Sequence, residues 1–444
     1  MKKHVFVMLI VLIVLGGGFV SAEEVSPEFQ IDQETPAYPE DRTVRDEIED
    51  FLMNKGYSEG RNTRSNGGDF FIAVGAGTIQ APRNHPAYLN ARNNAFEKAL
   101  LAAKKELTEF IGVEIEKSVE SDYTEGENPA DRQKRDAEAM KSPNITEKTT
   151  AFVHAKLDKL LAEEGIDLNK PVPVEAVKRA MTSEDFKQIV RTVAKARIVG
   201  MQTMKVFEAS PDGNKGQIGV VAVYSDKLHK MADAMFSGDT SASLKGTPKL
   251  PVVNQLPKDK MILLSTFGVQ QKTNERGERV LIAVGQGVPR TNNPRALDAA
   301  YSKAKVNALG ALRSFAGEVA VVKTDLHDSE STQEFDDNTE SYANDQYFSE
   351  KVKTTAEALK VSGITKISRW EAVHPLVNKK VVGVVLSWSP GSAATAMDMG
   401  QKMSKKPQKK SYSGASAKQE SYQSGSNQGG NYRAAGATAD EDSF

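Results

Sequence analysis

Two stretches of the chain end in a Gly-x-Gly pair, a feature that some loops use to hold phosphate groups. Residues 70–84 read FFIAVGAGTIQAPRN, and residues 280–293 read VLIAVGQGVPRTNN. A dinucleotide-binding loop would add a third glycine and run straight into a helix, and a P-loop would carry Lys-Ser or Lys-Thr. Neither continuation is present, and prolines lengthen both loops. The glycines therefore predict two strands that each end in a tight turn, at Gly75, Gly77, Gly285 and Gly287.

Other residue types that could do chemistry are scattered. The six histidines form no H-E-x-x-H or H-x-H pair, and no G-x-S-x-G nucleophile turn occurs. His374 is interpreted as a surface histidine. Asp336, Asp337 and Glu340 offer oxygen ligands for a weak calcium candidate, but they lack the D-x-D-x-D-G spacing, so a solvated loop is favoured. We expect no catalytic residue, no cofactor and no other metal site.

The elements that flank these loops occur twice. Residues 95–112 read AFEKALLAAKKELTEFIG and residues 300–317 read AYSKAKVNALGALRSFAG, which agree without gaps at one constant offset. Such self-similarity indicates a duplicated unit. The residues expected to form the core of both copies, besides the four glycines, are Ala95, Phe96, Ala99, Ala103, Leu107, Phe110, Gly112, Ala300, Tyr301, Ala304, Ala308, Leu312, Phe315 and Gly317.

The shared pattern is typical of a helix that packs on a sheet. Alanines recur every four residues, which lets the backbone of a helix approach strands closely. Gly112 and Gly317 stand where a left-handed residue would end each helix. Lys104, Lys105 and Glu106 are placed mostly on the opposite, solvated face.

A second match follows at a smaller offset. Residues 192–209 resemble residues 355–372, and the strands at 218–225 and 382–389 put Tyr224 and Trp388 in equivalent places. The sequence thus predicts an α+β protein: two tandem copies of a small domain with Ala-rich helices on an antiparallel or mixed sheet. The expected organisation is a flexible lead-in at 23–43, a first repeat at 44–236 with a helical insert at about 155–190, a linker at 237–257, a second repeat at 258–400 and a disordered low-complexity tail at 401–444.

Composition and the N-terminus bear on compartment. The 444 residues contain no cysteine, which excludes disulfides, thiolate metal sites and a lipid-modified cysteine, and the net charge of −1 gives no drive toward nucleic acid. Residues 1–22 read as a signal peptide: a basic start, an apolar run and small residues before Glu23. After cleavage we expect a periplasmic or secreted bacterial protein without stable membrane insertion.

Taken together, the Gly-x-Gly strand, the Ala-rich helix and the later G-V-V strand resemble one envelope family. It is the family of small outer-membrane lipoproteins to which flagellar assembly proteins P and T are similar, and the resemblance covers residues 70–115, 192–236, 280–320 and 355–400. It implies a small α+β unit without enzymatic activity that builds rings or disks around envelope machines. The lipoprotein cysteine is absent, and the tandem copies, insert and tail depart from single-domain members.

Three functions are compatible with these features. The first is an exported, non-catalytic envelope structural or assembly protein that acts by self-association or by binding an envelope protein. The second is a periplasmic module that binds a small ligand between the two repeats. The third is an exported hydrolase, for which no nucleophile–base pair is visible in the sequence.

Overall fold

The structure is a computed structural model that describes most of the chain after residue 41. The described residues are 42–64, 68–124, 128–141, 145–210, 216–239, 245–331, 359–404 and 433–440. The predicted signal peptide and most of the predicted lead-in lie outside them. Thr43 caps the first helix: its side chain accepts a hydrogen bond from the backbone N–H of Asp46, and the Asp46 carboxylate accepts one from the backbone N–H of Thr43.

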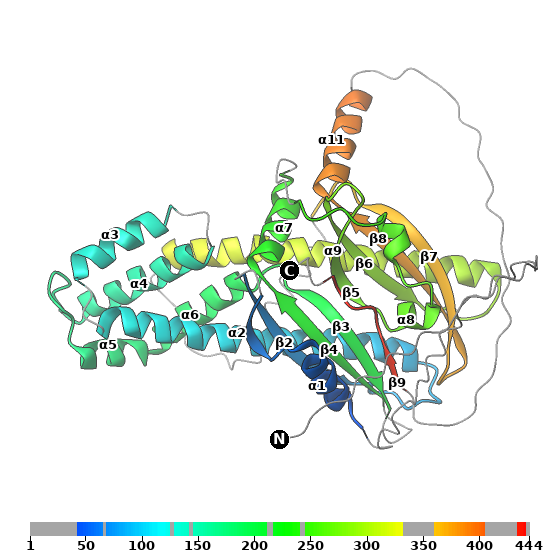
Figure 1. Cartoon of the computed structure of the whole chain (residues 1–444), viewed down its shortest axis with the longest axis horizontal. Coiled ribbons are helices and arrows are strands. Elements are labelled where there is room, and N and C mark those ends of the chain that lie inside the picture. The colour runs from blue at the N-terminus through cyan, green and yellow to red at the C-terminus, as the bar shows by residue number, and fades with distance from the viewer. Residues whose placement is uncertain are drawn as a thin grey trace, which may run out of the picture. The chain divides into compact units, whose positions relative to one another are not determined.

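The first repeat contains seven helices and four strands among the described residues (Figure 1). In chain order they are α1 Val44–Lys55, β1 Gly60–Thr63, β2 Asp69–Thr78, α2 Tyr88–Thr124, α3 Pro129–Ala139, α4 Ile145–Glu163, α5 Val174–Met181, α6 Glu184–Arg197, β3 Gln202–Ala209, β4 Gln217–Tyr224 and α7 Asp226–Ser237. Helix α1 packs on the face of the sheet opposite α2, through Ile48 and Leu52.

The second repeat begins with two short helices and again has four strands in the described region. Its elements are η1 Val252–Gln255, α8 Lys260–Leu264, β5 Gly268–Thr273, β6 Arg279–Gly287, α9 Pro294–Ser331, β7 Thr365–His374, β8 Lys379–Trp388 and α11 Pro390–Ser404, followed by β9 Arg433–Ala435 near the C-terminus. Pro294 is the first residue of α9, a position that suits proline because its missing N–H has no partner in the first turn of a helix.

Both sheets are antiparallel, and the second has the same order as the first four strands of the first. The first runs β1-β2-β4-β3-β9 and the second β5-β6-β8-β7. Tyr224 pairs with Phe71 in one sheet, and Trp388 pairs with Leu281 at the matching position of the other. The predicted α+β class with two copies of one sheet-based unit is confirmed.

Gly75 and Gly285 lie inside their strands, so the turn predicted at these two glycines is wrong, whereas Gly77 is the last residue but one of β2 and Gly287 is the last residue of β6. Gly75 pairs with Val220 within β2, and Gly285 pairs with Val384 within β6. A Cβ atom on Gly75 would lie 2.6 Å from the backbone nitrogen of Ala103. Glycine is needed here because the helix backbone packs directly on the strand.

The alanine stripe makes the same contact in both repeats. A Cβ atom on Gly285 would meet the backbone of Ala304 and Ala308, the counterparts of Ala99 and Ala103. The helix stripes are buried in both copies, except that Phe110 and Tyr301 are half-buried: Ala95, Phe96, Ala99, Ala103, Leu107, Ala300, Ala304, Ala308, Leu312 and Phe315. Tyr224 and Trp388 are buried as well.

Neither helix ends at its predicted glycine. Gly112 lies within α2, which continues to Thr124, and Gly317 lies within α9, which continues to Ser331. Gly112 faces α6, where an added Cβ would be 3.5 Å from the Val190 side chain. The prediction fails because the helix packs against further helices beyond the sheet, and this packing outweighs the helix-ending tendency of glycine.

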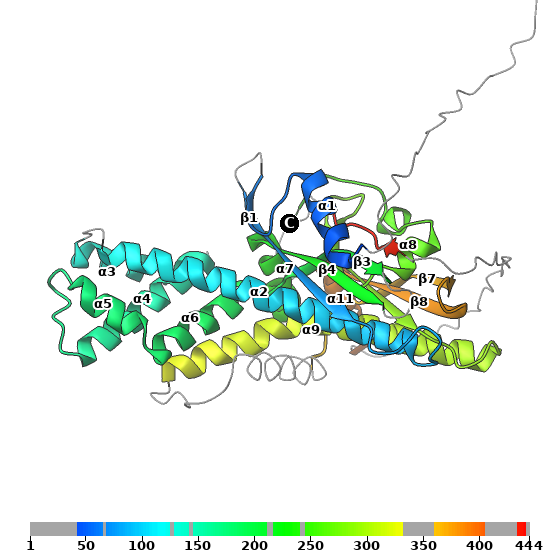
Figure 2. The same cartoon turned by 90° about the horizontal axis from the view of Figure 1, so that it is seen from below.

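The extension of α2 carries the insert of the first repeat. Helices α3, α4, α5 and α6 contact one another and the distal half of α2, on the side away from the sheets (Figures 1 and 2). Pro171 and Pro173 separate α4 from α5. We call α3–α6 with the distal half of α2 the helical arm.

Buried apolar contacts join the two repeats. Ala196, Met231 and Met235 from α6 and α7 belong to the same buried cluster as Ala304 and Ala308 of α9. Lys303 contacts Asn90, and Lys104 forms an ion pair with Glu318, so α2 and α9 run in the same direction (Figure 2). Lys104 is therefore an inter-repeat contact and not part of a solvated face.

The C-terminus differs most from the expectation of a disordered tail. Residues 401–404 complete α11, and residues 433–440 lie along the edge of the first sheet, where β9 pairs with β3. Residues 405–432 and 441–444 lie outside the described residues. The segment at 433–440 has no large aliphatic side chain, and it can join a sheet because strand pairing uses main-chain groups.

The predicted linker also makes specific contacts. Lys245 forms a bridge with Glu278, and the backbone N–H of Lys249 donates to the Asn274 carbonyl oxygen at the β5–β6 hairpin. Residues 245–257 thus lie against the second repeat. Within the described ranges, no helix combines the length and apolar character required to cross a bilayer.

Candidate functional site

A buried charged cluster lies where the two repeats meet, and we call this junction the seam. Arg92 of α2, Glu208 of β3 and His374 of β7 are each at most 1% exposed. The Arg92 guanidinium lies 2.7 Å from the Glu208 carboxylate, and His374 Nε2 lies 3.2 Å from the other Glu208 oxygen. The cluster therefore uses side chains from both repeats.

Arg92 also reaches backbone and aromatic groups of the second repeat. Its guanidinium donates to Gln286 Oε1 at 3.0 Å and to the Leu264 carbonyl oxygen at 2.8 Å. The same guanidinium lies 4.6 Å from the centre of the Phe267 ring, which stacks on Phe96. Such a planar fork satisfies several acceptors at once, which a lysine could not do.

The charges of Glu208 and Arg92 compensate each other within the seam. Burial acts to raise the pKa of Glu208, but Arg92 and the hydrogen bond from His374 outweigh it and lower that pKa to about 2. Burial lowers the pKa of His374, against the opposing effect of Glu208. At neutral pH the cluster thus holds an ionised Glu208, a cationic Arg92 and a neutral His374 that donates its Nε2 proton. Both carboxylate oxygens of Glu208 have a partner, so the role that this geometry supports is structural pairing of the side chains.

His374 is consequently not the surface histidine that the sequence predicts. It ends β7 and packs edge-to-face with Tyr88 at a ring distance of 6.0 Å. The sequence could not reveal the pair because Glu208 lies in the other repeat.

The C-terminal segment, residues 433–440, completes the seam. Ala434 pairs with Glu208 in the β9–β3 ladder, and the backbone N–H of Ala439 donates to the Met204 carbonyl oxygen at 2.7 Å. On its other side the backbone N–H of Ala437 donates to Thr266 Oγ1 at 2.9 Å. The segment is therefore bound by both repeats, and we call the groups that hold it the acceptor site.

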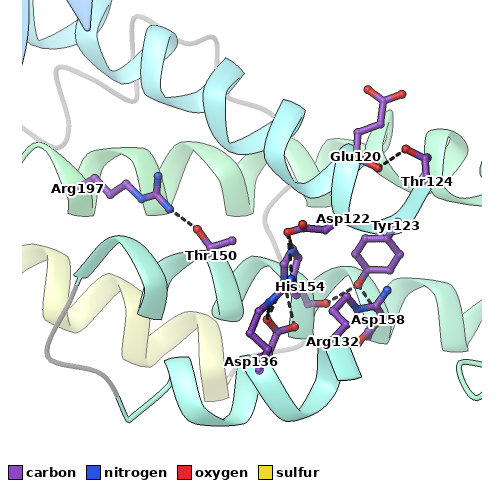
Figure 3. Close-up of polar contacts among 11 residues, drawn as sticks. Glu120, Asp122, Tyr123, Thr124, Arg132, Asp136, Thr150, His154, Asp158 and Arg197 are labelled. Carbon is purple, nitrogen blue, oxygen red and sulfur yellow. Dashed lines mark hydrogen bonds and ion pairs between the residues drawn. The ribbon is translucent and has the colours of Figure 1, made fainter. Parts of the chain in front are cut away.

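A second buried polar cluster lies in the helical arm around His154 of α4 (Figure 3). Its Nδ1 atom lies 3.0 Å from Asp136 of α3, and its Nε2 atom lies 3.2 Å from Asp122 of α2. The ring is fully buried. One histidine thus joins three helices through two carboxylates.

The neighbouring residues extend this cluster by one helical turn. Tyr123 donates from its hydroxyl to Asp158 at 2.7 Å, and Arg132 pairs with the same carboxylate oxygen at 2.7 Å (Figure 3). The Arg132 guanidinium covers the Tyr123 ring at 3.7 Å. Burial, followed by the charge of Asp158, raises the pKa of Tyr123. The tyrosine hydroxyl is therefore a hydrogen-bond donor at every physiological pH.

The His154 cluster was not foreseen from the sequence. Asp122, Arg132 and Asp136 lie in a polar stretch of the first repeat that carries no recognised motif. The available signal was Asn128-Pro129, a helix-starting pair that places Arg132 and Asp136 on one face of α3. Across the described ranges no set of three or more histidine, cysteine or acidic side chains is arranged to hold a metal ion. Asp336, Asp337 and Glu340 lie outside those ranges.

A carboxyl pair lies at the edge of the first sheet. Glu106 of α2 accepts a long hydrogen bond of 3.4 Å from the backbone N–H of Val74. Burial, a hydrogen bond with Glu59 and the charge of Glu59 raise the pKa of Glu106 to about 7. Glu59 in turn forms an ion pair with Arg45 of α1. The sequence analysis places Glu106 on a solvated face, and this prediction is wrong. Glu106 instead forms a contact with Glu59 that depends on its protonation.

Comparisons with known proteins give two matches. Residues 143–237, from the start of α4 to the end of α7, match a family described as "Domain of unknown function (DUF6844)". No curated protein matches the chain. A crystal structure of a hypothetical protein from Francisella tularensis is similar, with 21% sequence identity, a TM-score of 0.48 and coverage of 79% of this chain and 92% of that one.

Proposed function

We propose that the protein is an exported, non-catalytic structural or assembly protein of the bacterial cell envelope that acts through protein–protein contacts. The observation that carries the proposal is the pairing of the C-terminal segment with β3. A sheet edge that accepts an extended peptide is a common protein-recognition device, in which main-chain hydrogen bonds supply affinity.

The polar side chains support the same function. In both buried clusters the polar groups contact one another: Glu208 contacts Arg92 and His374, and His154 contacts Asp122 and Asp136. Catalytic groups need a substrate-facing atom that such pairing does not leave. These clusters instead fix the repeats and the helical arm in place, which suits a scaffold.

Export is the second part of the proposal, and it rests on the N-terminal sequence. Removal of residues 1–22 would leave a mature chain beginning at Glu23. Intact-mass measurement of the protein recovered from periplasmic and secreted fractions should show this mature mass. Full-length mass on cytoplasmic protein would contradict export.

The contact function is tested by light scattering of the mature protein over a wide concentration range, together with cross-linking in intact cells. We expect either a concentration-dependent rise in mass or a specific cross-link to one envelope protein. A strict monomer that forms no cross-link would overturn the proposal. Native mass spectrometry tests the ligand-binding alternative. A small molecule retained by that monomer in a stoichiometric amount would favour it.

A further inference from the structure

The acceptor site binds the C-terminal segment from two sides. On the β3 side, the backbone N–H of Gly436 donates to the Val206 carbonyl oxygen at 2.8 Å, beyond the β9 ladder. On the β5 side, the buried Gln270 amide donates to the Ala437 carbonyl oxygen at 2.9 Å. The segment is therefore held as an added edge strand of the first sheet, with further hydrogen bonds from the second repeat.

The site also selects the segment by size and charge. A Cβ atom on Gly436 would lie 2.8 Å from the Ser265 carbonyl carbon, so a larger residue cannot occupy this position without displacing backbone. Ala439 is buried in the outer core of the first sheet. At the end of the segment Asp440 lies 3.1 Å from Lys249 Nζ. The fit is thus specific for a small-residue strand with an acidic end.

None of these contacts depends on the segment and the site being in the same chain. All acceptor groups come from residues 47–272, whereas the segment follows α11 only after residues 405–432. A connection of that length can span up to about 90 Å when extended. Exchange of an identical terminal element between copies keeps every bond that the closed form makes.

We propose that the acceptor site binds the C-terminal segment of a second copy, so that copies are joined head to tail by strand exchange. This inference rests on the proposed function and names its partner. Within one chain the connection raises the local concentration of the segment, which favours the closed form in dilute solution. Exchange is favoured where many copies are held side by side, as in an envelope assembly.

The absence of cysteine makes a direct test possible. Ala209 of β3 lies opposite Arg433 of β9, so Ala209→Cys and Arg433→Cys put two thiols within disulfide reach. Each substitution is made in a separate full-length chain, and the two chains are mixed at high concentration and oxidised. We expect a disulfide-linked heterodimer at several times the yield of a control mixture in which Lys205→Cys replaces Ala209→Cys.

Gly436→Val gives the test a direction. In the chain that carries Ala209→Cys, it expels that chain's own segment, and we expect the heterodimer yield to rise severalfold. In the chain that carries Arg433→Cys, it disables the donor, and the yield should fall to that of the control. Circular dichroism of each variant checks that the fold is retained.

Two outcomes would overturn strand exchange. One is a disulfide that forms only within a chain carrying both cysteines, with no mixed product above the control. The other is a heterodimer yield that Gly436→Val leaves unchanged in the donor. If the unmodified protein still self-associates or cross-links to an envelope partner, the proposed function stands without strand exchange. If it does neither, the proposed function itself fails.

Discussion

The close contact between Gly285 and α9 predicts that Gly285→Ala is strongly destabilising. The new Cβ atom would lie 2.1 Å from the Ala304 carbonyl oxygen, whereas an ordinary contact is roughly 3.5 Å. Helix α9 would have to withdraw by more than about 1 Å along its alanine stripe. A gap of this size forfeits a quarter to a half of each contact, so we expect a loss of about 3 kcal/mol in the free energy of unfolding.

Intrinsic backbone effects have the opposite sign, which makes the test decisive. Alanine in place of glycine in a strand stabilises by about 0.5–1 kcal/mol when the site has room. Gly310 of α9 provides the matched control, because an added Cβ meets nothing within 4 Å there. Gly310→Ala should therefore raise the free energy of unfolding by about 1 kcal/mol.

The assay is urea unfolding followed by tryptophan fluorescence. Both tryptophans, Trp370 and Trp388, lie in the second repeat, and Trp388 is on β8 next to β6. The signal thus reports the repeat that carries both substitutions. We expect the urea midpoint to fall by about 1 M or more for Gly285→Ala and to rise for Gly310→Ala. A midpoint at or above that of the wild type for Gly285→Ala would refute the packing argument.

Three further predictions concern buried and half-buried polar side chains. Arg92→Met leaves Glu208 buried without its cation and should lower the free energy of unfolding by about 3–5 kcal/mol. The urea midpoints measured by circular dichroism and by fluorescence should both fall, and unchanged midpoints would contradict a structural role for the seam. His154→Leu removes the shared partner of Asp136 and should destabilise the helical arm by about 3 kcal/mol, lowering the circular dichroism midpoint while the fluorescence midpoint stays constant. Because the pKa of Glu106 is raised from 4.5 to about 7, the folded state binds its proton more tightly, so its contribution is present below about pH 4.5 and is lost as the pH rises through 7. Solvent screening of this half-exposed group limits the loss to about 1–2 kcal/mol, and Glu106→Gln should flatten the pH profile of the urea midpoint over that window; an unaltered slope would argue against the carboxyl contact.

The repeat, the fold class and the buried helix stripe follow from the sequence alone. Close contact between a helix and a sheet requires small residues at a fixed spacing. Both copies therefore carry the same local pattern of small residues, for example at Ala103 and Ala308. The strand-ending role expected of Gly75 was wrong because a close approach and a turn both require glycine. Only the group that packs against the glycine shows whether a close approach or a turn requires it.

The contacts of the seam and the helical arm and the position of the C-terminal segment follow only from the tertiary structure. Arg92, Glu208 and His374 come from three distant elements, so no local spacing announces their contact. His154 likewise gains its carboxylates from two other helices. The C-terminal segment lacks the apolar pattern by which strands are recognised, and its place is set by main-chain hydrogen bonds that every residue except proline can make. A sequence records which side chains must be buried, but the pairing of backbone groups and of distant charges depends on which surfaces the fold brings together.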